Sequence, residues 1–286
     1  MILPRQDPAA PSDVARHYDH LDRWYREIWG EHVHHGLWRT GRETSEEASR
    51  QLVREAADAA GIASGSRVVD VGCGYGATAE MLARERGARV TGVTISPVQH
   101  RRAAARAADL PDGALTVLLR DWMDNGLPSA SFDAAVAIES ASHMPDKRRF
   151  LEEIGRVLRP GGRVALCVWA ASESPRGWEV RHVLEPICRE GRLPGLATES
   201  EYRAWMTDAG FRGIEVRDWS AAVRRTWTVC AARGLGRWLA DGELRRFVLR
   251  GDSPERIYGL SILRLWAGFR TGAMRYLMIA GSVPEP

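Results

Sequence analysis

The sequence predicts an α/β fold in which a seven-stranded sheet, read as parallel, carries two helical additions. Three observations lead to this expectation. Short apolar runs typical of strands alternate with amphipathic segments from about residue 67 onwards, which favours β-α-β units with helices on both faces of the sheet. A glycine-rich turn directly follows the first of these runs. The 286 residues are enough for one large domain with additions, burying roughly 75% of the unfolded surface.

The expected strands follow from β-branched and apolar runs bounded by turn residues. They are residues 67–71, 89–94, 114–119, 132–139, 163–169, 213–219 and 274–280. The segments between them are helical in pattern. In residues 146–158 the apolar positions Phe150, Leu151, Ile154 and Val157 recur at helical spacing. The Arg-Pro-Gly-Gly that follows is expected to end this helix before the next strand.

Two helical additions flank the expected sheet. Residues 1–66 form a polar, aromatic-rich leader, predicted to be an N-terminal helical cap. Residues 67–286 form the core, with a helical insertion at about 220–272, between the sixth and seventh strands. Ligands of open α/β sheets bind outside the carboxyl ends of the strands. Both additions are therefore expected to roof a substrate cavity at that edge.

Composition excludes several classes of protein. With 44% hydrophobic and 27% charged residues and a net charge of +3, a soluble globular protein without a nucleic-acid partner is expected. The four cysteines show no C-x-x-C spacing, which favours a reducing cytoplasm without a disulfide framework. No stretch has the length and apolarity of a signal peptide or membrane span. The histidines of the leader lack acidic or cysteine partners at metal-site spacing, so no metal is expected.

The glycine-rich turn reads Val-Asp-Val-Gly-Cys-Gly-Tyr-Gly-Ala at residues 69–77. Gly72 permits a tight turn out of the strand, and Gly74 lets the backbone approach a ligand without a Cβ. Gly76 allows close packing where the helix begins. Because this is also a G-x-G-x-x-A pattern, a dinucleotide such as NAD is one alternative. A tight turn without a ligand is another.

The carboxylate before the glycines bears on these alternatives. A pyrophosphate at the helix N-terminus would bring its negative charges close to Asp70. S-adenosyl-L-methionine has no phosphate, and its sulfonium and ammonium groups are cationic, so a nearby carboxylate is favourable. Dinucleotide enzymes also usually carry an acid about 20 residues further on, where this chain has the neutral Thr94. These residues favour S-adenosyl-L-methionine over NAD.

Several motifs in order make a family recognisable. They are WGEHVHHGLW at 29–38, VVDVGCGYG at 68–76, VTGVTISPVQHRRA at 90–103 and FDAAVAIESASHMPDKRRFLEEIGRVLRPGGRVAL at 132–166. From about residue 15 to 280 the chain resembles the class I S-adenosylmethionine-dependent methyltransferases. The nearest resemblance is to the tocopherol methyltransferase-like small-molecule enzymes, distant relatives of cyclopropane fatty acid synthases.

This resemblance implies a Rossmann-like sheet, the cofactor S-adenosyl-L-methionine, and methyl transfer to O, N or C of a small, natural-product-like acceptor. A monomer or homodimer that binds neither nucleic acid nor a membrane is expected. A non-catalytic S-adenosylmethionine-binding partner protein and an NAD-dependent oxidoreductase are the alternatives.

The resemblance also implies a cofactor site. Its methionine and ribose parts would be lined by Asp70, Gly72, Gly74, Gly76, Thr94, Ile95 and Gln99. Asp121, Trp122 and Met123 would contact adenine, although Asp121 also fits a simple turn residue. His35 would close over the methionine end, with Tyr18 near the methyl group.

The loop after the fourth predicted strand, residues 139–147, is the expected place of the chemistry. Transfer to a neutral hydroxyl needs a base, and imidazole titrates near neutral pH. His143 is therefore the candidate base, with a loop-shaping role as its alternative, and Glu139 is a second base or a positioning group. Ser142 stands where relatives often carry the glutamate that cyclopropane synthases use to hold bicarbonate, which argues against cyclopropanation.

Overall fold

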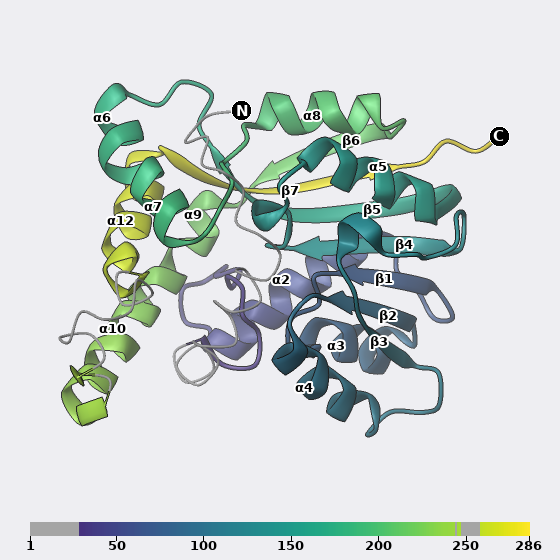
Figure 1. The fold of residues 1–286 in the computed structure, drawn as a ribbon, viewed down its shortest axis with the longest axis horizontal. Coiled ribbons are helices and arrows are strands. Elements are labelled where there is room, and N and C mark those ends of the chain that lie inside the picture. The colour runs from purple at the N-terminus through teal and green to yellow at the C-terminus, as the bar shows by residue number, and fades with distance from the viewer. Residues whose placement is uncertain (1–28, 244, 247–257) are drawn as a thin grey trace.

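The computed structural model describes residues 29–243, 245–246 and 258–286. Within these ranges the chain forms a seven-stranded sheet in the order β3-β2-β1-β4-β5-β7-β6 (Figure 1). The strands are β1 (Arg67–Val71), β2 (Arg89–Thr94), β3 (Leu115–Leu119), β4 (Phe132–Ile138), β5 (Leu158–Ala171), β6 (Arg212–Asp218) and β7 (Met274–Ser282). They overlap all of the predicted ranges, so the predicted α/β fold is confirmed.

The direction of the last strand was not predicted. β7 runs antiparallel to both β5 and β6, whereas the other paired strands are parallel. The expectation of a wholly parallel sheet is therefore wrong for β7. The physical reason is that the chain leaves β6 at its carboxyl end and returns from the helical insertion at that same edge. β7 consequently begins where the parallel strands end.

β5 begins earlier than predicted. The helix before it ends at Val157, one residue before the end of the predicted range, and Leu158 and the Arg-Pro-Gly-Gly stretch already belong to the strand. A shift in register against β4, between Phe132 and Ala134, accommodates this stretch. Gly161 supports the irregularity with a φ of +76°, which glycine adopts without strain.

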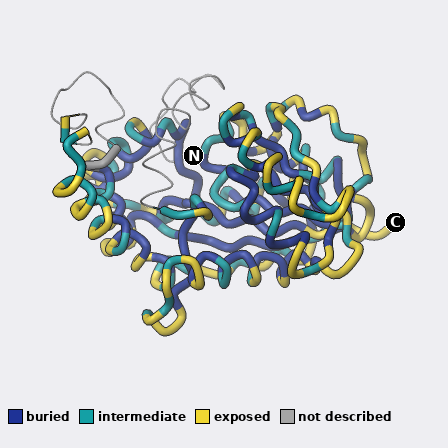
Figure 2. The backbone as a smooth tube through the Cα atoms, turned by 90° about the horizontal axis from the view of Figure 1, so that it is seen from below, coloured by how far each residue is buried: buried dark blue, intermediate teal, exposed yellow. Residues whose placement is uncertain are grey.

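Helices cover both faces of the sheet (Figure 1). One face carries α2 (Ser45–Ala59), α3 (Ala77–Arg86) and α4 (Pro97–Ala107), and the other carries α5 (Lys147–Val157) and α8 (Glu199–Asp208). Thr44 and Glu47 form a capping box that begins α2. The strands between the layers are mostly buried, with exposed residues gathered on the outer helices and turns (Figure 2).

The insertion between β6 and β7 is helical, as predicted. Its described helices are α9 (Ser220–Val223), α10 (Arg225–Ala240) and α12 (Tyr258–Thr271). The segment between β5 and α8 is also helical, as the pattern predicted, and contains α6 (Gly177–Glu179), the π-helical η3 (Val180–Leu184) and α7 (Glu185–Glu190). Its place in the cap was not predicted. Because α12 contacts both η3 and α7, the two segments form one cap at one end of the sheet (Figure 1).

The leader is described only in part. Its described portion includes α2, whereas the helices expected before residue 29 and the predicted site residue Tyr18 lie outside the described residues. The division of the chain at residue 66 into cap and core stays a prediction. In the portion that the structure describes, no helix combines the length and apolar character needed to cross a membrane.

Candidate active site

The predicted site residues meet at one edge of the sheet. β1 to β4 are parallel and closely aligned, so their carboxyl ends lie together. Asp70 and Gly72 stand at the end of β1, Thr94 ends β2, Asp121 follows β3 and Glu139 follows β4. The structure therefore brings residues from four strands to the edge where a cofactor is expected.

The three glycines of the turn have φ angles of +75°, +53° and +80°, in the left-handed region that favours glycine. A Cβ on Gly72 would lie 2.4 Å from Ser140 Cβ, and one on Gly76 would lie 2.8 Å from Ala103 Cβ. A Cβ on Gly74 would meet no described heavy atom within 4 Å. Gly72 and Gly76 are therefore required by packing, whereas no packing contact among the described residues requires Gly74.

Asp70 is the buried acid of this turn. Asp70 is only 2% exposed, and its Oδ2 has no hydrogen-bond partner among the described residues. Burial raises the pKa of Asp70 to about 7. A cation placed beside this carboxylate would favour its charged form, and a phosphate would oppose it. The residues present therefore fit a cationic cofactor.

The predicted ribose region is pre-ordered by hydrogen bonds. Thr94 Oγ1 donates to Gln99 Oε1 at 2.8 Å, and both residues are buried. Ser96 begins α4 by accepting a hydrogen bond from the backbone N of Gln99 at 3.1 Å. Ile95, half-buried, lies between the two in the chain. This geometry holds the Gln99 amide at the end of β2.

The predicted adenine region is a short turn. Asp121 accepts from the backbone N of Met123 at 2.9 Å and so begins the 3-10 helix η1 (Trp122–Asp124), which is the turn role given as its alternative. The side chain of Trp122 is buried, and its Nε1 donates to the carbonyl of Phe150 at 3.3 Å. Only the backbone of Trp122 is thus available to a ligand at this edge.

Glu139 lies at the centre of a hydrogen-bond network. Its Oε1 accepts from the backbone N of His35 at 2.6 Å, from His35 Nδ1 at 2.9 Å and from the hydroxyl of Tyr276 at 2.9 Å. Its Oε2 accepts from Trp169 Nε1 at 3.0 Å. Burial alone would raise the pKa of Glu139, but the charge and hydrogen bonds of His35 outweigh burial and hold this pKa below its ordinary value.

Sequence reasoning missed Trp169 and Tyr276. They are directly opposed on the antiparallel strands β5 and β7, so their meeting depends on a strand direction that the sequence did not predict. Aromatic rings with centroids 5.0 to 5.8 Å away surround the buried ring of His35, and they belong to Trp29, Trp169, Trp227, Phe269 and Tyr276. In the sequence, the only signal for an aromatic environment around His35 was the abundance of tryptophan in the second half of the chain.

His143, the predicted base, ends the short helix η2 (Ala141–His143) and is half-buried. Its backbone N donates to the carbonyl of Ser140 at 3.1 Å. Ser142 Oγ beside it is buried and has no hydrogen-bond partner in the described ranges. His143 therefore lies on the loop that begins at Glu139, and its role as a base stays a prediction.

The neighbouring histidines of the leader, His32 and His34, form a buried hydrogen-bonded pair. His34 Nδ1 donates to the carbonyl of His35 at 2.8 Å, and His34 Nε2 lies 3.2 Å from His32 Nδ1. Burial, followed by the charges of His34 and Arg50, lowers the pKa of His32 to about 3. No group of three or more His, Cys, Asp or Glu side chains is placed to hold a metal ion in the part of the chain that the structure describes.

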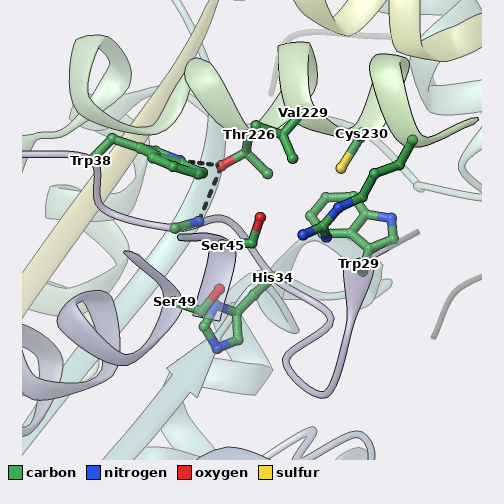
Figure 3. Close-up of a pocket in the computed structure, with 10 residues that line it drawn as sticks. Trp29, His34, Trp38, Ser45, Ser49, Thr226, Val229 and Cys230 are labelled. Atoms are coloured by element: carbon green, nitrogen blue, oxygen red, sulfur yellow. Dashed lines mark hydrogen bonds between the residues drawn. The ribbon is translucent and has the colours of Figure 1, made fainter. Parts of the chain in front are cut away.

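A pocket separates the leader from α10 (Figure 3). It is small, with room for about one water molecule. Thr226 Oγ1 on α10 accepts from the backbone N of Gly36 at 3.1 Å and from Trp38 Nε1 at 3.0 Å. His34, Ser45 and Ser49 lie across the pocket from α10. Thr226 is thus a point at which the cap holds the leader.

Known proteins resemble this chain in sequence and in fold. Residues 69–166 match a family described as a methyltransferase domain. The 27-O-demethylrifamycin SV methyltransferase of Amycolatopsis mediterranei (strain S699) is 35% identical over 226 residues, which cover 78% of this chain and 82% of the relative. The chloroplastic tocopherol O-methyltransferase of Arabidopsis thaliana is 32% identical over 75% of this chain and 67% of its own length.

Among solved structures, the mycolic acid cyclopropane synthase CmaA1, complexed with SAH and CTAB, has the same fold. Its TM-score is 0.84 at 20% identity, over 96% of this chain and 98% of that one.

The chain belongs to the S-adenosylmethionine-dependent methyltransferases. It is an enzyme whose cofactor is S-adenosyl-L-methionine and whose reaction is methyl transfer. The predicted family, fold and cofactor are confirmed. The oxidoreductase and the non-catalytic binder are left without support.

Proposed function

We propose that this enzyme methylates a hydroxyl group on a small, largely apolar, natural-product-like molecule. The observation that carries the donor side of the proposal is the buried carboxylate of Asp70, whose Oδ2 has no hydrogen-bond partner among the described residues. It precedes a turn in which a Cβ on Gly74 would meet no described atom within 4 Å. A hydroxyl acceptor is supported by the similarity to relatives whose names describe O-methyl transfer. An apolar acceptor is supported by the aromatic side chains that the cap and leader gather at this edge.

When bound, S-adenosyl-L-methionine supplies a methyl group on a positively charged sulfur. In the proposal Asp70 and the glycine turn hold the methionyl part, and Thr94, Ile95 and Gln99 hold the ribose. Asp121, the backbone of Trp122 and Met123 border the adenine, while His35 and Tyr18 cover the methionine end. These residues act by orientation and exclusion of water, which can lower a barrier by about 7 to 11 kcal/mol in favourable cases.

The proposed base is the imidazole of His143, which accepts the proton of the acceptor hydroxyl. Its position on the loop after β4, beside the glycine turn, supports this role. A positioned base contributes about 10²- to 10⁴-fold to the rate.

The proposed setting is the reducing cytoplasm, because Cys73, Cys167, Cys188 and Cys230 are all free and buried. The proposed assembly is a monomer or a homodimer, which light scattering of the purified protein distinguishes.

Incubation with donor labelled in the methyl group tests the reaction. The acceptors are apolar phenols and alcohols, the same compounds with every hydroxyl already methylated, and matched amines. We expect label only in compounds with a free hydroxyl. Label in the blocked compounds or in the amines alone would contradict O-methylation.

A further inference from the structure

Glu139 connects segments that are far apart in the chain. Its hydrogen-bond partners Trp169, His35 and Tyr276 lie 30, 104 and 137 residues away in sequence. They come from β5, the leader and β7, respectively. Hydrogen bonds to an ionised carboxylate are among the stronger ones in proteins. One side chain therefore ties the leader to the edge formed by three strands.

The backbone of Glu139 is also unusual. Its φ is +60°, in the left-handed region that non-glycine residues rarely adopt. Such a conformation persists only where the surrounding structure holds it, and it is concentrated at functional sites. The four hydrogen bonds to the carboxylate supply this restraint.

The next residue carries the connection to the glycine turn. Ser140 Cβ lies only 2.4 Å from the place that a Cβ on Gly72 would occupy. The backbone of Gly72 is therefore packed against the residue that Glu139 orients. The carbonyl of Ser140 also accepts the hydrogen bond that shapes the turn at His143. A displacement at Glu139 would consequently reach the leader, the glycine turn and the His143 turn together.

We propose that Glu139 is a positioning residue, the latch that holds the leader loop of residues 32–38 on the edge of the sheet and so completes the cofactor site; this inference rests on the proposed function. The carboxylate holds both the backbone N and the ring of His35, and the left-handed backbone sets the direction of the loop that follows. Glu139 does not serve as a second base, since both of its oxygens already accept hydrogen bonds from buried donors.

Two variants separate the contribution of the Glu139 side chain from that of its backbone. Glu139→Gln removes the charge with little change of shape, and Glu139→Gly removes the carboxylate but relieves the positive φ. The matched control is Asp133→Asn at the opposite end of β4. Asp133 Oδ2 accepts from the backbone N of Arg67 at 2.7 Å, and its Oδ1 lies 2.9 Å from Arg159 Nε.

Calorimetry with S-adenosylhomocysteine and hydrogen exchange of the amides in residues 32–38 are the measurements. We expect both Glu139 variants to weaken binding at least tenfold and to speed exchange in this loop. Asp133→Asn should leave both the affinity and the exchange rate unchanged, even if its melting temperature falls as much as that of the Glu139 variants. Tyr276→Phe removes one hydrogen-bond donor to Glu139 and should weaken binding less than the Glu139 variants do. Added to Glu139→Gln, it should cause no further loss of affinity.

Any one of three results would contradict the proposed positioning role of Glu139. These are wild-type affinity in Glu139→Gly, unchanged exchange of residues 32–38 in Glu139→Gln, and exchange accelerated equally throughout the chain. If the Glu139 variants do not fold, Tyr276→Phe decides, and normal binding and exchange there would reject the proposal. These measurements need no acceptor molecule. The positioning role of Glu139 can therefore be rejected while the wild type still methylates hydroxyls, and it can be supported even if the wild type does not.

Discussion

At the scale of single residues, the three glycines of the turn differ in what a Cβ would meet. A Cβ on Gly72 or Gly76 would clash with protein atoms, whereas one on Gly74 would meet no atom of the described residues within 4 Å. The spacing of the glycines predicted a ligand-binding turn, but only the packing around them shows which of the glycines the fold needs.

Gly74→Val should abolish binding of S-adenosylhomocysteine, because the added side chain occupies the space through which the cofactor approaches the backbone. Gly113→Val is the matched control, since Gly113 also has a positive φ of +74° and open space around its Cβ position. Both variants should lose comparable stability. Unchanged affinity of Gly74→Val by calorimetry would reject the assignment.

Asp70→Asn should stabilise the protein without cofactor at pH 8. The folded-state pKa of about 7 lies above the ordinary 3.8, so the folded chain holds a proton that the unfolded chain releases, and stability falls as the pH rises from about 4 to 7. That shift corresponds to about 4 kcal/mol, from which a partnerless buried amide removes about 1 to 3 kcal/mol. Denaturant unfolding at pH 5 and pH 8 measures the gain.

The same variant should bind the cofactor more weakly. A cationic ligand favours the ionised carboxylate, so wild-type affinity should rise between pH 6 and pH 8 while the affinity of Asp70→Asn stays flat. Asp112→Asn, in an exposed loop, is the control and should behave as the wild type. A wild-type affinity that does not change over this range would count against Asp70 as the partner of the cation.

His143→Ala should keep the affinity for S-adenosylhomocysteine and lower turnover of a hydroxyl acceptor by about 10²- to 10⁴-fold, since a positioned base would be lost. His182→Ala, an exposed histidine of the cap, serves as the control. Wild-type turnover in His143→Ala would retire its assignment as the base and leave the loop-shaping alternative.

At the scale of elements, local patterns predicted the strands and the helix α5 because each depends on side chains only a few residues apart. Those patterns did not predict that the α6 to α7 segment joins the cap, nor the direction of β7. β7 is antiparallel because the chain leaves the cap at the carboxyl ends of the parallel strands. Where the chain leaves the cap depends on how the cap helices pack. This direction places Tyr276 opposite Trp169 at the edge where Glu139 lies.

The contact between the cap and the leader is testable at Thr226. Thr226→Val leaves the backbone N of Gly36 and the indole N of Trp38 without their acceptor, and we expect a loss of about 2 kcal/mol in the free energy of unfolding. Thr226→Ser keeps the hydroxyl and should lose much less. Equal stability of the two variants, measured by denaturant unfolding, would show that these hydrogen bonds do not hold the leader.

At the scale of the whole molecule, the proposed cofactor site spans the ends of β1 to β4, so occupation should stabilise the fold as a unit. A ligand at 100 times its dissociation constant adds about 2.7 kcal/mol, which is roughly 4 °C in melting temperature for a chain of this length. S-adenosylhomocysteine should produce this shift and NAD should not. A larger shift with NAD would contradict the donor assignment.

The sequence by itself determined the layered fold, the glycine turn and the preference for a cationic cofactor. These features depend on residues within one strand, one turn and the start of one helix, where chain connectivity sets the geometry. Only the tertiary structure decided how Glu139 is used, because its partners lie 30 to 137 residues away in sequence. Hydrogen bonds over such separations depend on how the sheet, leader and cap pack together, and no local pattern of residues encodes that packing.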